Sequence, residues 1–358
     1  MITEARHCFV LGAGFSCAYS STAPTMGDFL QRASDIGVYQ PNGSHRQLAD
    51  IAERYFRSPI EVNIESLASL LALDSTPTLS PEKESRAAAY DQLIEIIEGT
   101  LVGIYDSPRT LEIKNLFTSF ANRLVDLRIP VVTLNYDLLM DQLLKDTGQW
   151  LPAAGYGIEL PLAGFTRNDA SLNDEIRAAT RRAPSKTVLL KLHGSLNWGR
   201  RNLKYSDGSH PLELSPAGAL NPGSAQHILP IKNMSSSPIA HPGSYFWDTY
   251  IVPPFVAKSP GSGVEPALEN IWYMARAALA QAQFIHFLGY SLPPSDFQMD
   301  ILIREGFWSW IAHDMKKRVF VVDRESAVRE RFACQFRQIE IDTSNTDISD
   351  YIARLIRS

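Results

Sequence analysis

The sequence is poor in several features that mark membrane, secreted or metal-centred proteins. Its 358 residues include three cysteines, Cys8, Cys17 and Cys334, which are scattered without a paired spacing. This pattern disfavours a disulfide framework and a four-cysteine zinc site. The longest apolar runs, such as "FIHFLG" and "VFVV", have the length of a strand. They fall far short of the ~20 residues that a membrane-spanning helix needs.

The charge balance gives no sign of a nucleic-acid partner. The formal net charge is -5, and the basic runs "RR" at 181 and "KKR" at 316 are short. Binding to a phosphate backbone needs a local excess of Lys and Arg. The first residues contain a short apolar run without a small-residue cleavage site behind it, which is typical of a strand and not of a signal peptide. We therefore expect a cytoplasmic protein without membrane or direct nucleic-acid contacts.

Strand-like and helical stretches alternate along much of the chain. Several of the strand-like runs are continuously apolar or β-branched, as in a parallel sheet whose two faces are both covered. Helical patterns at 137–146, 266–282 and 325–336 lie among them. This alternation predicts an α/β fold, a Rossmann-like parallel sheet with helices on both faces. The strand-like runs are residues 8–12, 129–134, 187–193, 249–254, 283–289, 318–323 and 338–343.

Two long insertions interrupt the alternation. Most residues between the first two strand-like runs have helical patterns, so we expect an all-helical module over residues 37–125. Residues 196–248 are rich in Ser, Pro, Gly and Asn, and they predict a long irregular loop. Such a loop is a candidate lid or partner-facing segment. The core would then comprise residues 1–36 and 126–358, with the loop inside it.

The stretch "GAGFSCA" ends the first strand-like run and opens a helix. Gly12 and Gly14 suit a tight turn that brings backbone amides close to a pyrophosphate at a helix start. The third glycine of the usual dinucleotide fingerprint is replaced by Cys17, and the expected acidic residue about 20 positions later is missing. A phosphate site and an ordinary strand-to-helix corner both stay open, whereas a hydride-transferring dehydrogenase is disfavoured.

Polar residues also end other strand-like runs, where ligands bind in doubly wound sheets. Asn135 in "TLNYD" is either a helix cap or a catalytic side chain. His193 in "LKLHGS" is either structural or a general base, since histidine titrates near neutral pH. Gly289 and Ser291 in "FLGYSLPPSD" suit close approach to a ligand. Asp323 in "VVD" could bind a ribose diol through its two oxygens.

In order and context, "GAGFS", "TLNYD", "LHGS", "GYSLPPSD" and "VVD" resemble the sirtuin-like (silent information regulator) family of NAD-binding proteins. The resemblance spans essentially the whole chain apart from the two insertions. The segments "NIESLASLL" (63–71) and "YIVPPFVAKS" (250–259) resemble the bacterial branch of this family. Five motifs in one order are more specific than any single motif.

The resemblance implies a role for each matching residue. Asn135 would face the nicotinamide ribose and position a water molecule, and His193 would act as a base on the ribose hydroxyls. Asp137 would lie near the carboxamide of nicotinamide. The remaining residues would hold the rest of NAD+: Gly12, Ala13, Gly14 and Ser16 the phosphates, Gly289 and Ser291 the adenosine side, and Asp323 the adenosine ribose.

One departure from the family pattern bears on the reaction. Sirtuins that remove acyl groups from lysine carry a four-cysteine zinc module shortly after the catalytic histidine, but here no cysteine lies between His193 and Cys334. Family members without this module more often hydrolyse NAD+, in many cases as NAD-depleting effectors of bacterial antiphage defence. The resemblance thus implies an NAD+ glycohydrolase without a metal, giving nicotinamide and ADP-ribose or a cyclised form.

Two alternatives stay open at this point. One is an NAD-dependent protein deacylase or ADP-ribosyltransferase, and the other is a nucleotide-sensing module without turnover. A hydrolase that destroys NAD+ must be restrained in a healthy cell, so we expect the helical module or the irregular loop to carry restraint or a partner. The family implies an operon-encoded ATPase or short Argonaute protein as that partner, and a homo-oligomer.

Overall fold

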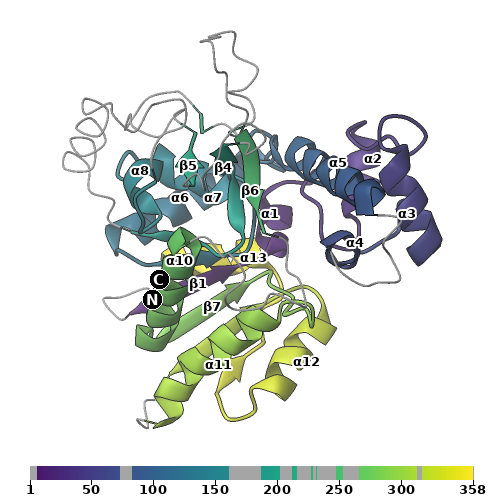
Figure 1. Cartoon of the computed structure of the whole chain (residues 1–358). Coiled ribbons are helices and arrows are strands. Elements are labelled where there is room, and N and C mark those ends of the chain that lie inside the picture. The colour runs from purple at the N-terminus through teal and green to yellow at the C-terminus, as the bar shows by residue number, and fades with distance from the viewer. Residues whose placement is uncertain are drawn as a thin grey trace.

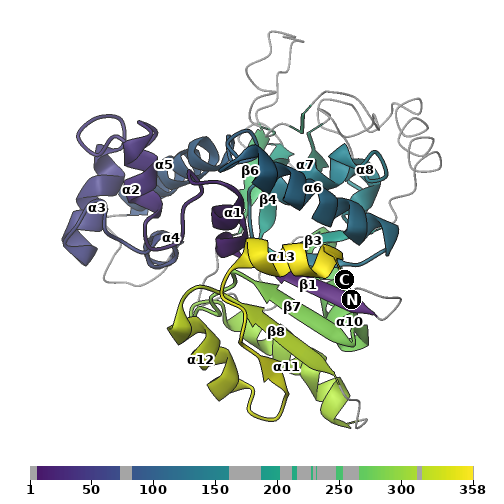
Figure 2. The same ribbon diagram turned by 180° about the vertical axis from the view of Figure 1, so that it is seen from behind.

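A six-stranded parallel sheet forms the centre of the protein (Figures 1 and 2). The computed structural model describes residues 6–72, 83–160, 187–201, 212–215, 227–228, 231, 247–252, 266–312 and 317–357. The strands stand in the order β3-β2-β1-β7-β8-β9, and each neighbouring pair is parallel. They are β1 (His7–Leu11), β2 (Val131–Thr133), β3 (Leu189–Lys191), β7 (Phe284–Leu288), β8 (Arg318–Val322) and β9 (Ile341–Asp342).

Helices cover both faces of this sheet. On one face α1 (Ala13–Tyr19), α6 (Leu111–Asp126) and α13 (Ile348–Arg357) pack together, and on the other α10 (Pro266–Gln281) packs against α11 (Phe297–Ala312) (Figures 1 and 2). Every residue of β1, β2 and β3 is buried, which explains their lack of polar alternation. The predicted Rossmann-like fold is confirmed. The other core helices are α7 (Leu139–Asp146), α8 (Pro152–Gly155) and α12 (Ser326–Gln335).

The strand order reverses at β1. The chain runs outward from β1 to β2 and β3, and it then returns to place β7 on the other side of β1. Phe9 is accordingly aligned with Val131 on one side and His286 on the other. Such a switch point leaves a crevice beyond the carboxyl ends of the central strands. The turns that follow β1 and β7 border this crevice.

A helical module lies beside the sheet (Figure 1). It consists of α2 (Phe29–Asp35), α3 (Arg46–Phe56), α4 (Ile64–Ala72) and α5 (Lys83–Leu101), with α5 packed against the other three. Its limits differ from the predicted 37–125, since α2 belongs to its packing and α6 does not. Phe117 and Phe120 of α6 pack instead against Phe15 and Phe9 of the core, each with ring centroids 5.0 Å apart. None of the helices described here has the length and apolar character to cross a lipid bilayer.

A second, antiparallel sheet occupies part of the segment predicted as an irregular loop. Strand β4 (Gly194–Arg201) pairs with β5 (Glu213–Leu214) and β6 (Trp247–Ile251). The run at 249–254 therefore contributes to this sheet and not to the parallel one. The sequence of β4 does not look like a strand, because polar residues occupy positions where apolar ones are expected. Ser195 and Asn197 are fully buried. Apart from residues 196–201, 212–215, 227–228, 231 and 247–248, the predicted loop lies outside the described residues.

Two histidines lie in the core of the parallel sheet. His7 Nδ1 is 2.9 Å from His286 Nε2, and His286 Nδ1 is 2.6 Å from the Tyr351 hydroxyl of α13. The His286 ring stacks against Phe9 and Phe320 with centroid distances of 4.3 and 5.0 Å. Burial lowers the pKa of His7 to about 4 and that of His286 well below its usual range. Both rings are therefore neutral in the folded protein at neutral pH.

We predict that acidification from pH 7 to pH 5 destabilises the protein partly through His286. Histidines of the unfolded chain titrate near pH 6.5, so in this window the unfolded state binds more protons and stability falls as the pH falls. Replacing His286→Phe should reduce the pH-dependent loss of unfolding free energy by about 2 kcal/mol, measured by urea unfolding at both pH values. An equal loss in wild type and variant would contradict this account.

Candidate functional site

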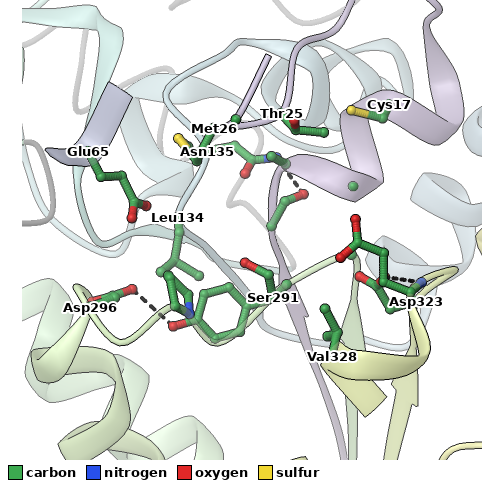
Figure 3. A pocket seen from close by; sticks show the side chains of 18 of the residues that line it. Cys17, Thr25, Met26, Glu65, Leu134, Asn135, Ser291, Asp296, Asp323 and Val328 are labelled. Carbon is green, nitrogen blue, oxygen red and sulfur yellow. Dashed lines mark hydrogen bonds between the residues drawn. The ribbon is translucent and has the colours of Figure 1, made fainter. Parts of the chain in front are cut away.

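A cavity of about 470 Å³ opens beyond the carboxyl ends of β1, β2 and β7 (Figure 3). Its wall combines the turns after these strands with residues of α1, α4 and the segment after β8. The cavity thus lies at the switch point of the sheet. Eight of the ten predicted site residues line it: Gly12, Ala13, Gly14, Asn135, His193, Gly289, Ser291 and Asp323.

The floor of the cavity is a backbone-to-backbone contact between the turns after β1 and β7. The Gly12 amide donates to Leu288 O at 3.1 Å, and the Gly14 amide donates to Gly289 O at 3.0 Å. A Cβ on Gly12 would lie 2.6 Å from Gly289 O, and one on Gly14 would lie 2.7 Å from Gly289 Cα. Packing alone therefore requires both glycines of the first turn. The same packing leaves bare backbone on the cavity wall.

Asn135 links the end of β2 to the first turn. Its Nδ2 donates to Gly12 O at 3.0 Å and to Ser16 Oγ at 3.1 Å. Its side chain does not cap α7, because the Leu139 amide at the start of that helix donates to Asp137 Oδ1 at 3.0 Å. With the amide nitrogen held by two acceptors, the amide oxygen is left to accept a hydrogen bond from a ligand or a water molecule.

Ser16 and Asp137 lie one layer behind the cavity wall, which differs from the predicted ligand contacts. The Ser16 hydroxyl donates to Asp137 Oδ2 at 2.7 Å, and the two residues are only 2% and 6% exposed. Burial raises the pKa of Asp137, although the nearby Lys191 ammonium opposes this rise. Lys191 itself donates to Asp137 O at 2.6 Å and to Asp141 Oδ2 at 2.9 Å. This buried network holds Ser16, and through it Asn135, in place.

His193 follows β3 and lies in the cavity wall, where it is 3% exposed. Its carbonyl accepts the Val252 amide at 2.8 Å, and Gly194, with φ +85°, turns the chain into β4. His193 Nε2 is 3.8 Å from Asp296 Oδ1. The Tyr290 hydroxyl donates to Asp296 Oδ2 at 3.0 Å. An imidazole and a carboxylate thus share one buried part of the wall.

Asp323 lies at the opposite end of the cavity from Glu65 and Asp296, and Ser291 lies between them (Figure 3). One carboxylate oxygen of Asp323 accepts the Glu325 amide at 2.9 Å. Burial raises the pKa of Asp323. The cavity therefore has polar side chains at both ends, and the glycines of the two turns add bare backbone to its wall.

Sequence reasoning missed several acidic residues of the wall, and Glu65 and Asp296 are the two buried ones. Both stand inside stretches that were already singled out, Glu65 in "NIESLASLL" and Asp296 in "GYSLPPSD". An acidic residue inside such a motif could have been named as a candidate site residue. Carboxylates are rarely buried without a function or a partner. The Ser295 hydroxyl donates to the Glu65 carboxylate, so the helical module contributes to the wall through α4.

Cys17 occupies the place of the third fingerprint glycine and also lines the cavity. Its thiol donates to Ala23 O at 3.4 Å. Burial, together with the nearby carboxylates of Asp28 and Asp137, raises its pKa to about 11. The thiol therefore stays protonated at neutral pH and is a poor nucleophile.

No family model matches the chain, and no curated protein matches it. Three solved structures that match nearly its whole length are Sir2 proteins. A Sir2 homologue in complex with NAD is 12% identical, with 99% of this chain and 90% of that chain covered and a TM-score of 0.45. Sir2Tm bound to a propionylated peptide is 11% identical, with 98% and 92% covered and a TM-score of 0.41. A mutant Sir2 homologue with ADP-ribose is 12% identical, with 99% and 93% covered and a TM-score of 0.43.

We predict that Gly289→Ala destabilises the protein by about 2 kcal/mol or more, because a Cβ at a left-handed position is strained. Gly289 has φ +62°, and its Cβ would lie 2.4 Å from the Gly14 carbonyl carbon. Urea unfolding measures the effect. Gly103→Ala is the matched control, since no heavy atom lies within 4 Å of a Cβ there. Equal stability of the two variants would show that the contact between the turns is not needed.

Proposed function

We propose that the protein is an NAD+ glycohydrolase, which cleaves the bond between nicotinamide and ribose. The products are nicotinamide and ADP-ribose or a cyclised form of it. One observation carries the proposal: Asn135, His193 and Asp323, which follow three different strands, line a single cavity at the switch point of the sheet. This is the arrangement that the resemblance to the sirtuin-like family implies.

The proposal gives NAD+ one direction in the cavity. The nicotinamide ribose lies between Asn135 and His193, and the adenosine ribose lies at Asp323. The diphosphate crosses the floor formed by the first turn. The Gly12 and Gly14 amides already donate to carbonyl oxygens, so these glycines serve by allowing close approach.

Cleavage of this bond needs little acid catalysis from the protein. The pyridinium ring takes the electron pair of the breaking C1'–N bond and leaves as neutral nicotinamide. Positive charge develops on the ribose, and a water oxygen then forms the new bond to C1'. In this proposal the Asn135 amide oxygen holds that water, and His193 accepts the proton that the water loses.

The cysteine positions bear on the alternative of a lysine deacylase. Cys8 lies on β1, Cys17 on α1 and Cys334 on α12, so the three thiols belong to three separate elements. A four-cysteine module of the kind found in deacylating sirtuins cannot be assembled from them. This favours hydrolysis over deacylation, with NAD+ as the substrate and no metal in the proposed mechanism.

We place this activity in bacterial antiphage defence, as a regulated NAD-depleting effector in the cytoplasm. The support is the resemblance to the bacterial branch of the family and the contribution of the helical module to the cavity wall through Glu65. A homo-oligomer and an operon-encoded ATPase or short Argonaute partner belong to the same proposal. A partner that moves the module would act directly on the site.

We predict that Asn135→Ala and His193→Ala each lower nicotinamide release from NAD+ by about 10²-fold or more, because they remove positioning of water and proton transfer. Chromatography of the reaction mixture measures both products. Asn115→Ala, on the exposed side of α6, is the matched control and should release nicotinamide at the wild-type rate. Undiminished release by both site variants contradicts the mechanism. Tight NAD+ binding without release by the wild type would favour a sensing module.

We predict that Asp323→Ala weakens ADP-ribose binding by about 10-fold or more, because a hydrogen bond to a half-buried charged group is lost. Nicotinamide mononucleotide lacks the adenosine half, so its affinity should be unchanged in this variant. Calorimetric titration of both ligands tests the proposed direction of NAD+. Equal weakening of the binding of both ligands would contradict the placement of the adenosine ribose at Asp323.

A further inference from the structure

Two buried carboxylates, Glu65 and Asp296, lie at the end of the cavity that His193 borders (Figure 3). Glu65 belongs to α4 and is 6% exposed, whereas Asp296 directly precedes α11 and is 3% exposed. The Ser295 hydroxyl donates to the Glu65 carboxylate. Because Ser295 and Asp296 are consecutive, this bond brings the two acidic residues together from distant parts of the chain.

Neighbouring groups hold Asp296 in a defined orientation. Its Oδ2 accepts the Tyr290 hydroxyl at 3.0 Å, and its Oδ1 accepts the Met299 amide at 3.3 Å. The same Oδ1 is 3.8 Å from His193 Nε2. The negative charge is therefore placed beside the imidazole by the fold itself, and it does not depend on a mobile side chain.

The two carboxylates also influence one another. Burial raises the pKa of Glu65, and the charge of Asp296 raises it further, against the effect of the Ser295 hydrogen bond. Both carboxylates add to the rise that burial causes in the pKa of Tyr136 and Tyr290, which line the same wall. Because interacting carboxylates ionise in two steps, the pair takes on its second negative charge less readily than its first.

Among the residues that the structure describes, the cavity wall has no lysine or arginine at the His193 end. Among the cavity-lining residues that the structure describes, Arg324 is the one lysine or arginine, and it directly follows Asp323. The electrostatic potential at the His193 end, where Glu65 and Asp296 lie, is therefore negative. A negative field inside a protein favours a cationic group of a ligand and disfavours an anionic one.

We propose that Glu65 and Asp296 form a carboxylate pair that holds one negative charge and selects a positively charged ring at the His193 end of the cavity. This inference rests on the proposed function, which places the nicotinamide there. The pair then favours the oxidised pyridinium over a neutral ring of the same shape. It also faces the positive charge that develops on the ribose, and it loses its attraction for nicotinamide once the ring has left as a neutral molecule.

The test compares ligands that differ in the charge of the ring. Carbocyclic NAD+, with a methylene in place of the ring oxygen of the nicotinamide ribose, keeps the cationic ring and resists cleavage, whereas NADH carries a neutral ring. Calorimetric titration of the wild type should show a preference for carbocyclic NAD+ of about 10-fold or more. E65Q and D296N should each keep most of this preference, because the remaining carboxylate takes up the charge. The double variant E65Q/D296N should bind the two ligands within about two-fold of one another.

ADP-ribose is the control ligand, and its affinity should stay within about two-fold in all variants because it has no ring at this end. E61Q is the control variant, since Glu61 is exposed and lies shortly before α4. Thermal unfolding checks that each variant is folded. A full wild-type preference in the double variant overturns the proposal. So does complete loss of the preference in one single variant, or an equal loss of affinity for ADP-ribose.

The outcome separates this inference from the proposed function. A wild-type protein that prefers the cationic ring but releases no nicotinamide from NAD+ supports the carboxylate pair and contradicts the hydrolase. A wild-type protein that releases nicotinamide but shows no preference contradicts the pair and leaves the hydrolase standing.

Discussion

The backbone contact between the turns after β1 and β7 is the constraint on which the site depends. It forms because the switch in strand order places β1 and β7 side by side, and because the residues that touch, Gly12, Gly14 and Gly289, lack side chains. Asn135 is in turn bonded to Gly12 O, and Ser16, Asp137 and the buried Lys191 support it from behind. A displacement of this contact would therefore move the cavity floor and the amide that faces it together.

The cavity that results has a graded chemical character. Carboxylates stand beside His193 at one end, Ser291 of the turn that begins at Gly289 lies between, and Asp323 stands beside Arg324 at the other end. A ligand with a cationic ring, a diphosphate and a ribose diol in this order would meet a suitable group at each point. The helical module supplies one of these groups, Glu65, so the module is part of the site as well as a neighbour of it.

The parallel sheet, and the gathering of most of the predicted residues around one cavity, could be predicted from the sequence because they follow a simple rule. Continuously apolar runs form strands buried on both faces, and polar residues at their carboxyl ends gather at one edge. Whether a polar side chain faces the cavity or lies behind its wall could not be predicted in this way. Ser16 and Asp137 have the same polar character as Asn135, but they bond to one another behind the wall. A sequence pattern does not distinguish a side chain that faces a ligand from one that supports its neighbour.

Partners across long sequence separations were also beyond prediction. The apolar face of α6 predicts a helix with a buried side, but the packing of Phe117 and Phe120 on the core, rather than on the helical module, emerges only in three dimensions. Glu65 and Ser295 are 230 positions apart, and only the fold brings them together. The buried polar residues of β4 similarly obscured a strand in a segment that resembled a loop.

A crystal structure of the protein with ADP-ribose would test the central claim most directly. The account predicts the adenosine ribose at Asp323, the diphosphate over Gly12 and Gly14, and the second ribose between Asn135 and His193. Density for ADP-ribose in the reverse direction, or at a site away from the carboxyl ends of β1 and β7, would contradict it.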